Sequence, residues 1–151
     1  MNKELEFYKS YHNNIINKWI HFFCIPMIVS SIIILLNNFY VLYEKNKLVK
    51  KIKLSSVIMS FYIISYSFIG WDIGLLMSFY FILLNSISNY IIVNHDYISI
   101  ARYMFIYGWI FQFIGHYIEG KRPALIDSIS QSFYQAPLFS LEVIYPQLLK
   151  I

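Results

Sequence analysis

Hydrophobic positions along the chain gather in four long runs that predict membrane-spanning helices. The runs cover residues 19–43, 54–71, 73–94 and 103–118, and none of them contains Asp, Glu, Lys or Arg. About 20 apolar residues cross the hydrocarbon core of a bilayer, and backbone inside lipid must form helices or a closed barrel. The runs lack the alternation of apolar and polar residues that barrel strands show, so they predict helices.

Polar segments separate the runs and set the expected element boundaries. We expect a loop over residues 44–53, a tight turn at Trp71-Asp72, a break over residues 94–96 and a helix end over residues 119–123. The tail, residues 127–151, is apolar but interrupted by Gln and Pro, which predicts an amphipathic segment or a short fifth helix. The predicted fold is therefore all-α: a multi-pass membrane helical bundle of about four transmembrane helices, with residues 1–151 forming a single integral membrane domain.

Composition supports a membrane protein. Hydrophobic residues make up 58% of the 151-residue chain and charged residues 13%, about half the charged share of a soluble globular protein. The net charge is +4, and five lysines cluster in the predicted loop, as in a juxtamembrane segment that faces anionic headgroups: Lys45, Lys47, Lys50, Lys51 and Lys53. Lipid is thus the expected partner, and nucleic acid is not. The positive charges divide about equally between the two predicted sides and give no orientation.

The N-terminal residues and the cysteine content limit the targeting signals and the metal ligands that we expect. The first eighteen residues carry charges of both signs and no apolar core, so we expect no cleavable secretion signal there. Cys24 is the only cysteine, which excludes an internal disulfide and a thiolate metal cluster. Any metal must be held by imidazole or carboxylate groups.

Two histidines flank the start of the first run. His21 lies one turn inside it, where an ionisable side chain is costly and indicates function; an interfacial histidine that hydrogen-bonds a neighbour is the structural alternative. Nine residues of continuous helix would place His12 and His21 on opposite faces. A shared metal ion therefore requires a break between them. Asn13, Asn14 and Asn17 favour such a break, with Asn17 as a suitable N-cap for a helix that starts at Lys18.

The end of the fourth run carries a polar stripe. Gln112, His116 and Glu119 fall at positions i, i+4 and i+7 and share one helical face. A polar stripe on an apolar helix is expected to face the bundle interior, where Glu119 would orient the imidazole or bind the ion. A simple helix C-terminus explains His116, Lys121 and Arg122 through the helix dipole, but it does not explain Gln112 and Glu119.

The fourth histidine, His95, raises a geometric difficulty. Next to Asp96 in a predicted turn, it is as easily explained by a solvated loop. A straight helix would separate His95 from His116 by about 31 Å, so all four histidines can meet only if a run is broken or re-entrant. Gly108 is a candidate position for that break.

These motifs resemble a known family. Residues 8–12 (YKSYH) with Asn17 and His21, residues 108–116 (GWIFQFIGH), residues 123–127 (PALID) and Ala136-Pro137 with Glu142 are similar to motifs of the yeast-type 2-hydroxy fatty acid dioxygenases. These are endoplasmic-reticulum membrane proteins of phytosphingosine breakdown. The resemblance covers nearly the whole chain, although Glu119 follows His116 by three positions here and by four in the fungal protein.

The resemblance implies an iron(II)- and O₂-dependent α-oxidation of a 2-hydroxy fatty acid to the acid one carbon shorter. It implies His12, His21, His95 and His116 as metal ligands, while Gln112 and Glu119 are the candidate catalytic residues. Lys121 and Arg122 are candidates for binding the substrate carboxylate, or are interfacial anchors. Imidazole suits ferrous iron. The alternatives are another metal-dependent membrane lipid enzyme, although the histidine boxes of desaturases are absent, and a non-catalytic lipid-binding or scaffolding protein.

Overall fold

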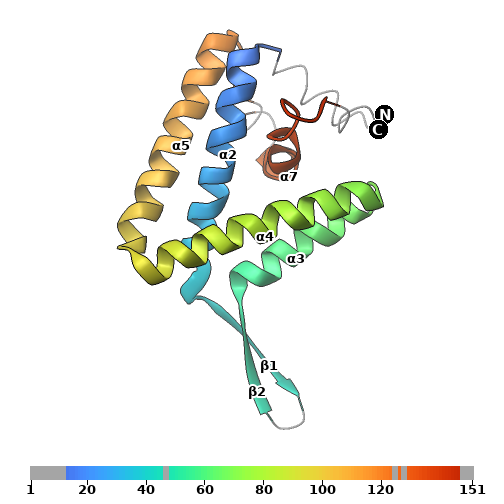
Figure 1. Cartoon of the computed structure of the whole chain (residues 1–151), viewed down its shortest axis with the longest axis vertical. Coiled ribbons are helices and arrows are strands. Elements are labelled where there is room, and N and C mark those ends of the chain that lie inside the picture. The colour runs from blue at the N-terminus through green and yellow to red at the C-terminus, as the bar shows by residue number, and fades with distance from the viewer. Residues whose placement is uncertain (1–12, 46–47, 124–125, 127–128, 147–151) are drawn as a thin grey trace. The chain divides into compact units, whose positions relative to one another are not determined.

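The computed structural model describes residues 13–45, 48–123, 126 and 129–146, and it is mostly helical (Figure 1). Its described elements are, in chain order, α2, η1, β1, β2, α3, α4, α5 and α7. They belong to two compact units. The first unit comprises residues 1–29 and 103–151, and the second comprises residues 30–102.

The first helix, α2 (Ile15–Leu35), begins with a side-chain cap. The Asn14 side-chain oxygen accepts a hydrogen bond from Ile16 N–H at 2.8 Å, and the Asn14 carbonyl accepts the first helical bond, from Lys18 N–H. This is the N-cap geometry that asparagine favours. The predicted chain break before His21 is confirmed, but the prediction of Asn17 as the cap was wrong. Asn17 already lies in the first turn of the helix, because Asn14 supplies the cap.

The second helix of the first unit, α5 (Tyr97–Glu119), is closed by a glycine at its C-terminus. Gly120 has a φ of +73°, a left-handed conformation that glycine adopts without strain. Gly120 N–H bonds the Tyr117 carbonyl, and Lys121 N–H bonds the His116 carbonyl, which is a Schellman motif. The helix therefore ends at Glu119, and the backbone of His116 is fixed within its last turn.

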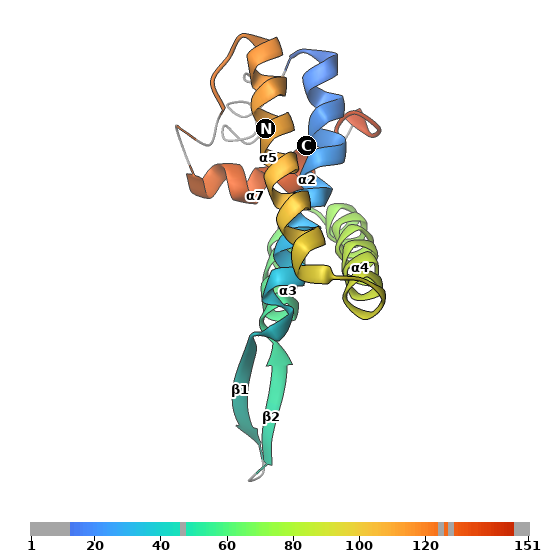
Figure 2. The same cartoon turned by 90° about the vertical axis from the view of Figure 1, so that its left-hand side faces the viewer.

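Two glycines bring α2 and α5 together in the first unit. A Cβ atom on Gly108 would lie 2.6 Å from Ile28 Cγ1, and one on Gly115 would overlap Asn17 Oδ1. Small residues allow helix backbones to approach closely. The two helices run side by side in Figures 1 and 2, and the two glycine contacts show that they are antiparallel. α5 is continuous through Gly108, so the break considered at this position does not occur.

The last helix of the first unit is α7 (Ile129–Phe139), and it confirms the predicted short fifth helix. Four of its described buried residues recur at helical spacing and so share one face: Ser132, Gln135, Leu138 and Phe139. The chain then turns back, and Glu142 forms an ion pair of 3.1 Å with Lys18 of α2. The tail is thereby attached to the beginning of α2.

In the second unit, the predicted polar loop is a β-hairpin. After the short 3-10 helix η1 (Leu36–Asn38), strand β1 (Tyr40–Lys45) pairs antiparallel with β2 (Leu48–Lys53), with Tyr40 opposite Lys53. The predicted helical fold is confirmed for most of the chain, but this two-stranded sheet departs from the predicted all-α class. The segment is rich in Tyr, Val, Leu and Ile, residues that favour or tolerate extended backbone, whereas its lysines had indicated only a solvated loop.

The hairpin leads into two paired helices, α3 (Leu54–Ser67) and α4 (Trp71–Asn94), which lie side by side in both views. The turn between them is Phe68–Gly70, so the predicted turn at Trp71-Asp72 is in fact the first turn of α4. A Cβ atom on Gly74 would overlap Ser67 Oγ and lie 2.9 Å from Ser67 Cα. Glycine is thus required where α4 passes the end of α3.

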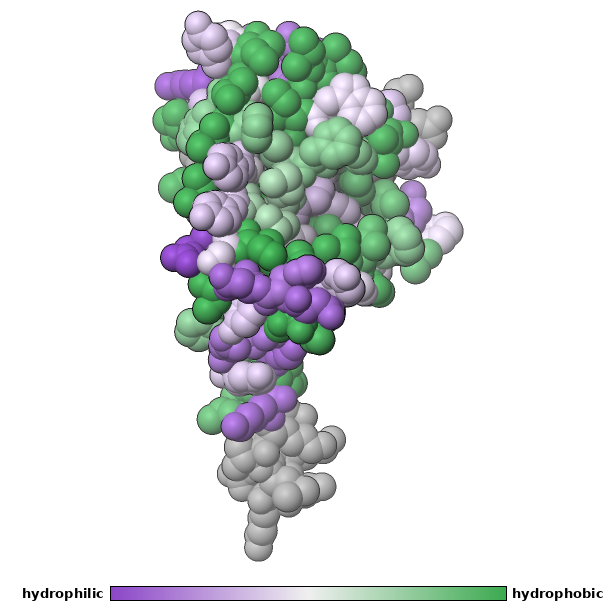
Figure 3. Space-filling view, turned by 60° about the vertical axis from the view of Figure 1, so that its left-hand side comes forward, coloured by the Kyte–Doolittle hydropathy of each residue, from purple (hydrophilic) through white to green (hydrophobic). Residues whose placement is uncertain are grey.

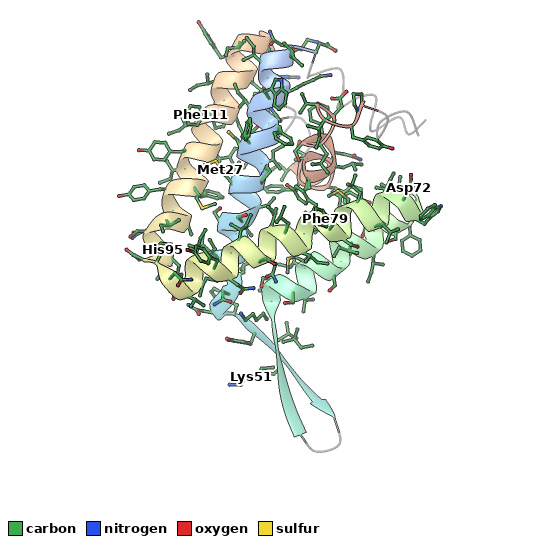
Figure 4. All side chains as sticks on the ribbon, viewed as in Figure 1. Met27, Lys51, Asp72, Phe79, His95 and Phe111 are labelled. Atoms are coloured by element: carbon green, nitrogen blue, oxygen red, sulfur yellow. The ribbon has the colours of Figure 1, made fainter. Side chains whose placement is uncertain are left out.

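Between α4 and α5, the break is short and capped. Asp96 Oδ1 accepts a hydrogen bond from Ser99 N–H at 3.4 Å, and its carbonyl accepts one from Ile100 N–H, as an N-cap does. The hydrogen bonds to Ser99 lower the pKa of the exposed Asp96 carboxyl. His95 is the C-cap of α4 and contacts Tyr90 with 5.8 Å between ring centroids. In Figure 4 His95 and Asp72 mark the two ends of α4.

Two described helical segments are long and apolar enough to cross a membrane, residues 15–38 and α4. The four predicted spans are thus confirmed only in part. α3 has 14 residues, about 21 Å of helix, and is shorter than a span. Large apolar side chains nevertheless remain exposed along the helices of both units, and Figure 3 shows hydrophobic residues covering much of one face.

Candidate metal centre

His21 of α2 is buried and held in one tautomer. Its side chain is 2% exposed, and Nδ1 lies 2.9 Å from the carbonyl oxygen of Asn17, one turn earlier. A carbonyl can only accept a hydrogen bond, so the neutral imidazole carries its proton on Nδ1. The lone pair is then on Nε2. Histidines that bind metals usually have this arrangement, in which the second nitrogen donates to a carbonyl or carboxylate.

His116 of α5 lies against His21. It is 6% exposed, and the two ring centroids are 5.2 Å apart with an interplanar angle of 83°. The pair is formed by the antiparallel contact of α2 and α5, and the Schellman motif fixes the backbone of His116. The structure therefore brings together two of the four predicted metal ligands.

Glu119 lies at the start of α2. Its Oε1 accepts a hydrogen bond from Asn13 N–H at 2.8 Å, and its Oε2 accepts one from Asn14 N–H at 2.9 Å. Oε2 also accepts from the Asn17 side-chain amide at 3.2 Å. The backbone N–H groups at a helix N-terminus attract a negative charge. Glu119 thus stabilises the beginning of α2 and joins it to the end of α5.

Gln112 lies on the same face of α5 as His116, one turn earlier. The contacts of Gly108 with Ile28 and of Gly115 with Asn17 and Ile20 set the antiparallel register, and this register places Gln112 level with His21. Gln112 is 6% exposed, and its Nε2 has no hydrogen-bond partner among the described residues. A buried donor without a partner costs about 1–3 kcal/mol, so it indicates a functional constraint.

Helix α7 contacts His21, a contact that the sequence did not predict. The Phe139 ring lies edge-on to His21 with centroids 6.0 Å apart. Ser132 and Gln135 share the buried face of α7 with Phe139 and are 6% and 2% exposed. Gln135 had been interpreted only as an interruption of an apolar tail. Its spacing of three from Ser132 and four from Phe139 was the signal for a buried face.

The other predicted site residues have different positions. His12 lies outside the described residues. His95 belongs to the second unit, at the end of α4, and stays a predicted ligand. Lys121 and Arg122 follow the Schellman motif and are exposed, next to the end of α5 that carries His116. Among the described residues, no group of three or more His, Cys, Asp or Glu side chains is arranged to hold a metal ion.

Sequence reasoning also missed the full part played by Asn17. This residue is fully buried; its side chain bonds Glu119, its backbone carbonyl bonds His21, and its Oδ1 faces Gly115. The signal was its position four residues before His21, which is the spacing of a helical side-chain to carbonyl contact. Its interpretation as an N-cap concealed this spacing.

Comparison with known proteins agrees with the motifs. Residues 1–148 match the family model described as 2-hydroxy-palmitic acid dioxygenase Mpo1-like. The chain is 34% identical over 143 residues to the 2-hydroxy-palmitic acid dioxygenase MPO1 of Saccharomyces cerevisiae, an alignment that covers 92% of this chain and 76% of the relative. No solved structure matches the chain. The extent of both matches shows that this chain belongs to the Mpo1-like family.

Proposed function

We propose that this chain is an iron(II)-dependent dioxygenase that converts a 2-hydroxy fatty acid to the fatty acid one carbon shorter. The observation that carries the proposal is the buried pair His21 and His116, which lies in a chain of the Mpo1-like family. The overall conversion balances when the carboxyl carbon leaves as CO₂. One 2-hydroxy acid and one O₂ then give the shorter acid, CO₂ and one water, and O₂ takes up the four electrons lost by the two carbons.

The donor set fits ferrous iron in kind. Imidazole nitrogens are suitable ligands for iron, and a centre held by few protein groups leaves positions for O₂ and for a chelating substrate. His21 and His116 would hold the ion. His12, which precedes Asn13 in the sequence, and His95 remain predicted further ligands. Bound iron would supply the activation of O₂, and the rest of the chemistry falls to the positions of the surrounding side chains.

The side chains around the histidine pair are suited to binding a substrate and to keeping water away from His21. The Gln112 amide offers buried N–H donors level with His21, suited to the carboxylate or the 2-hydroxyl of the substrate. Phe139 covers one edge of His21, which excludes water from the ligand ring. Lys121 and Arg122, which follow the end of α5, would attract the carboxylate of the substrate. Because the substrate chain is apolar, we propose that the protein lies in a membrane, that of the endoplasmic reticulum, and receives its substrate from lipid.

The proposal is tested with purified protein that is loaded anaerobically with ferrous iron and then given O₂ and 2-hydroxypalmitate. Mass spectrometry should detect the acid one carbon shorter, and His21→Ala and His116→Ala should form none. Palmitate, which lacks the 2-hydroxyl, is the matched substrate control and should not react. Iron bound without turnover would leave a metal-binding protein of another activity. Absence of iron would favour the lipid-binding or scaffolding alternative.

A further inference from the structure

Asn17 bonds His21 through its backbone carbonyl and bonds the end of α5, near His116, through its side chain. Its backbone carbonyl accepts the Nδ1 proton of His21 at 2.9 Å, and its side-chain amide donates to Glu119 Oε2 at 3.2 Å. Glu119 lies one helical turn beyond His116 on α5. The orientation of His21 and the position of the end of α5 therefore depend on the same fully buried residue.

The orientation of the Asn17 amide is determined by its neighbours. Its nitrogen faces the Glu119 carboxylate, which can only accept hydrogen bonds. Its oxygen faces Gly115, where α5 approaches so closely that a Cβ atom would overlap it. On that side Oδ1 is buried without a hydrogen-bond partner among the described residues. The hydrogen bond to Glu119 thus sets the orientation of the amide, because the reversed amide would place its oxygen against the carboxylate.

Glu119 has its oxygens engaged in the same arrangement. Oε1 accepts from Asn13 N–H, and Oε2 accepts from Asn14 N–H and from Asn17. These bonds place a negative charge at the positive end of the α2 helix dipole. They also fix the register of α2 against α5. We infer that Asn17 and Glu119 are positioning residues that set the tautomer of His21 and its distance from His116. The inference rests on the proposed function only in treating His21 as a ligand.

A substitution that replaces the Asn17–Glu119 hydrogen bond by electrostatic repulsion tests the role of the pair. Asn17→Asp places two carboxylates in contact, and like charges repel. In the apo protein, ¹⁵N NMR of the imidazoles should then show His21 leaving the Nδ1–H tautomer. Anaerobic titration with ferrous ion should show affinity reduced about 10- to 100-fold, as for other groups that orient metal ligands.

The double variant Asn17→Asp/Glu119→Gln keeps the test independent of folding. The amide introduced at position 119 can donate to the carboxylate introduced at position 17, and its oxygen can accept from Asn13 N–H, whereas Asn14 N–H loses its acceptor. The hydrogen bond between the two side chains therefore re-forms with its direction reversed. The double variant should therefore bind ferrous ion more tightly than either single variant, although the lost Asn14 bond keeps it weaker than the wild type. Asn38→Asp, the same change at an exposed residue of the second unit, is the control and should alter neither readout.

The outcomes separate this inference from the proposed function. If His21 of the wild-type apo protein is not in the Nδ1–H tautomer, or if Asn17→Asp leaves both readouts unchanged, the inference is wrong. It is also wrong if the double variant is no better than Asn17→Asp and Glu119→Gln. If the tautomer responds as expected but no variant, including the wild type, binds ferrous ion, the pair positions His21 and the iron proposal fails.

Discussion

The two units use polar side chains inside apolar helices in opposite ways. In the second unit, serines of α3 and α4 bond to carbonyls four residues earlier in their own helix: Ser65 to Phe61, Ser67 to Ile63, Ser78 to Gly74 and Ser86 to Ile82. In the first unit, Glu119 and Glu142 bond residues more than 100 positions away. Polarity that is satisfied within one helix says nothing about tertiary structure. Polarity that is satisfied between helices marks the place where the fold is specified.

The two units also differ in buried polar groups that have no hydrogen-bond partner. Among the described residues of the first unit, Gln112 Nε2, Ser132 Oγ and Glu142 Oε2 are buried without a hydrogen bond. In the second unit, buried Ser88 bonds the Ser30 carbonyl at 3.3 Å. This bond joins α4 to α2, so one buried serine of the second unit is satisfied between helices, unlike the serines that bond their own helix. These three groups lie in the unit that holds the histidine pair: Gln112 Nε2, Ser132 Oγ and Glu142 Oε2.

The largest expected effect is on metal binding by the first unit. His21→Ala should weaken ferrous ion binding at least about 100-fold, because one of few ligands is lost, and should abolish turnover. Ser86→Ala, in the second unit, should change neither. Iron content by elemental analysis and anaerobic titration measure both variants. Equal iron content in the two variants would contradict the assignment. The same measurement on His95→Ala tests whether His95 is a ligand.

Two glycines provide a second, smaller contrast. Gly115→Ala and Gly74→Ala each place a Cβ atom on an atom of a neighbouring helix, and such overpacking costs about 1–3 kcal/mol. Both variants should therefore unfold at lower temperature. Only Gly115→Ala should also weaken ferrous ion binding, because it displaces Asn17. Thermal unfolding monitored by circular dichroism, together with metal titration, checks this. Loss of metal by Gly74→Ala would show that the units are coupled.

Serines that bond their own helix should matter least to the free energy of unfolding. Ser65→Ala and Ser86→Ala remove a bond to a carbonyl that is already bonded within the helix, so we expect changes within about 0.5 kcal/mol. Ser132→Ala in α7 is the matched change in the first unit. Removing its buried, unpartnered hydroxyl should raise stability slightly. Denaturant unfolding curves of the three variants measure the difference, and a large loss in the first two would be inconsistent with local satisfaction.

The smallest effect is the acid dependence of the α5 cap. The pKa of Asp96 is lower in the folded protein than its ordinary value of 3.8, so the ionised carboxylate favours folding. This contribution is complete above the unfolded pKa and is lost as the pH falls below about 4 through the lowered pKa. Asp96→Asn should thus be slightly less stable than the wild type at neutral pH and equal to it in acid. Unfolding temperatures measured against pH give the comparison.

The sequence predicted most of the helices because the runs of apolar residues are long and their ends are marked. The end of α5 was legible from Glu119-Gly120 and the break before α2 from its asparagines. The β1–β2 hairpin was not predicted. Its lysines indicate a solvated loop, although residues such as Val41 and Ile52 favour extended backbone. The turn before α4 was displaced by three residues because Trp71-Asp72 is as suitable for a helix start as for a turn.

The candidate site was predictable where residues share one helix and not where they meet across helices. The stripe of Gln112, His116 and Glu119 follows from helical spacing alone. The contact of His21 with His116 was expected only from the resemblance and from the end of the bundle at which both lie. The bonds of Glu119 to the start of α2, and the contact of Phe139 with His21, depend on tertiary packing. No local pattern contains that information.

The Asn17–Glu119 bond also constrains the order in which the molecule can be made. It closes 102 residues of chain, whereas the α3–α4 hairpin closes within one turn, and distant contacts form later in folding than local ones. During synthesis, the N-terminus of α2 has no carboxylate partner until Glu119, at the end of α5, has been added to the chain. A nascent chain that stops before Glu119 therefore has a complete α3–α4 pair but lacks the carboxylate that bonds the start of α2.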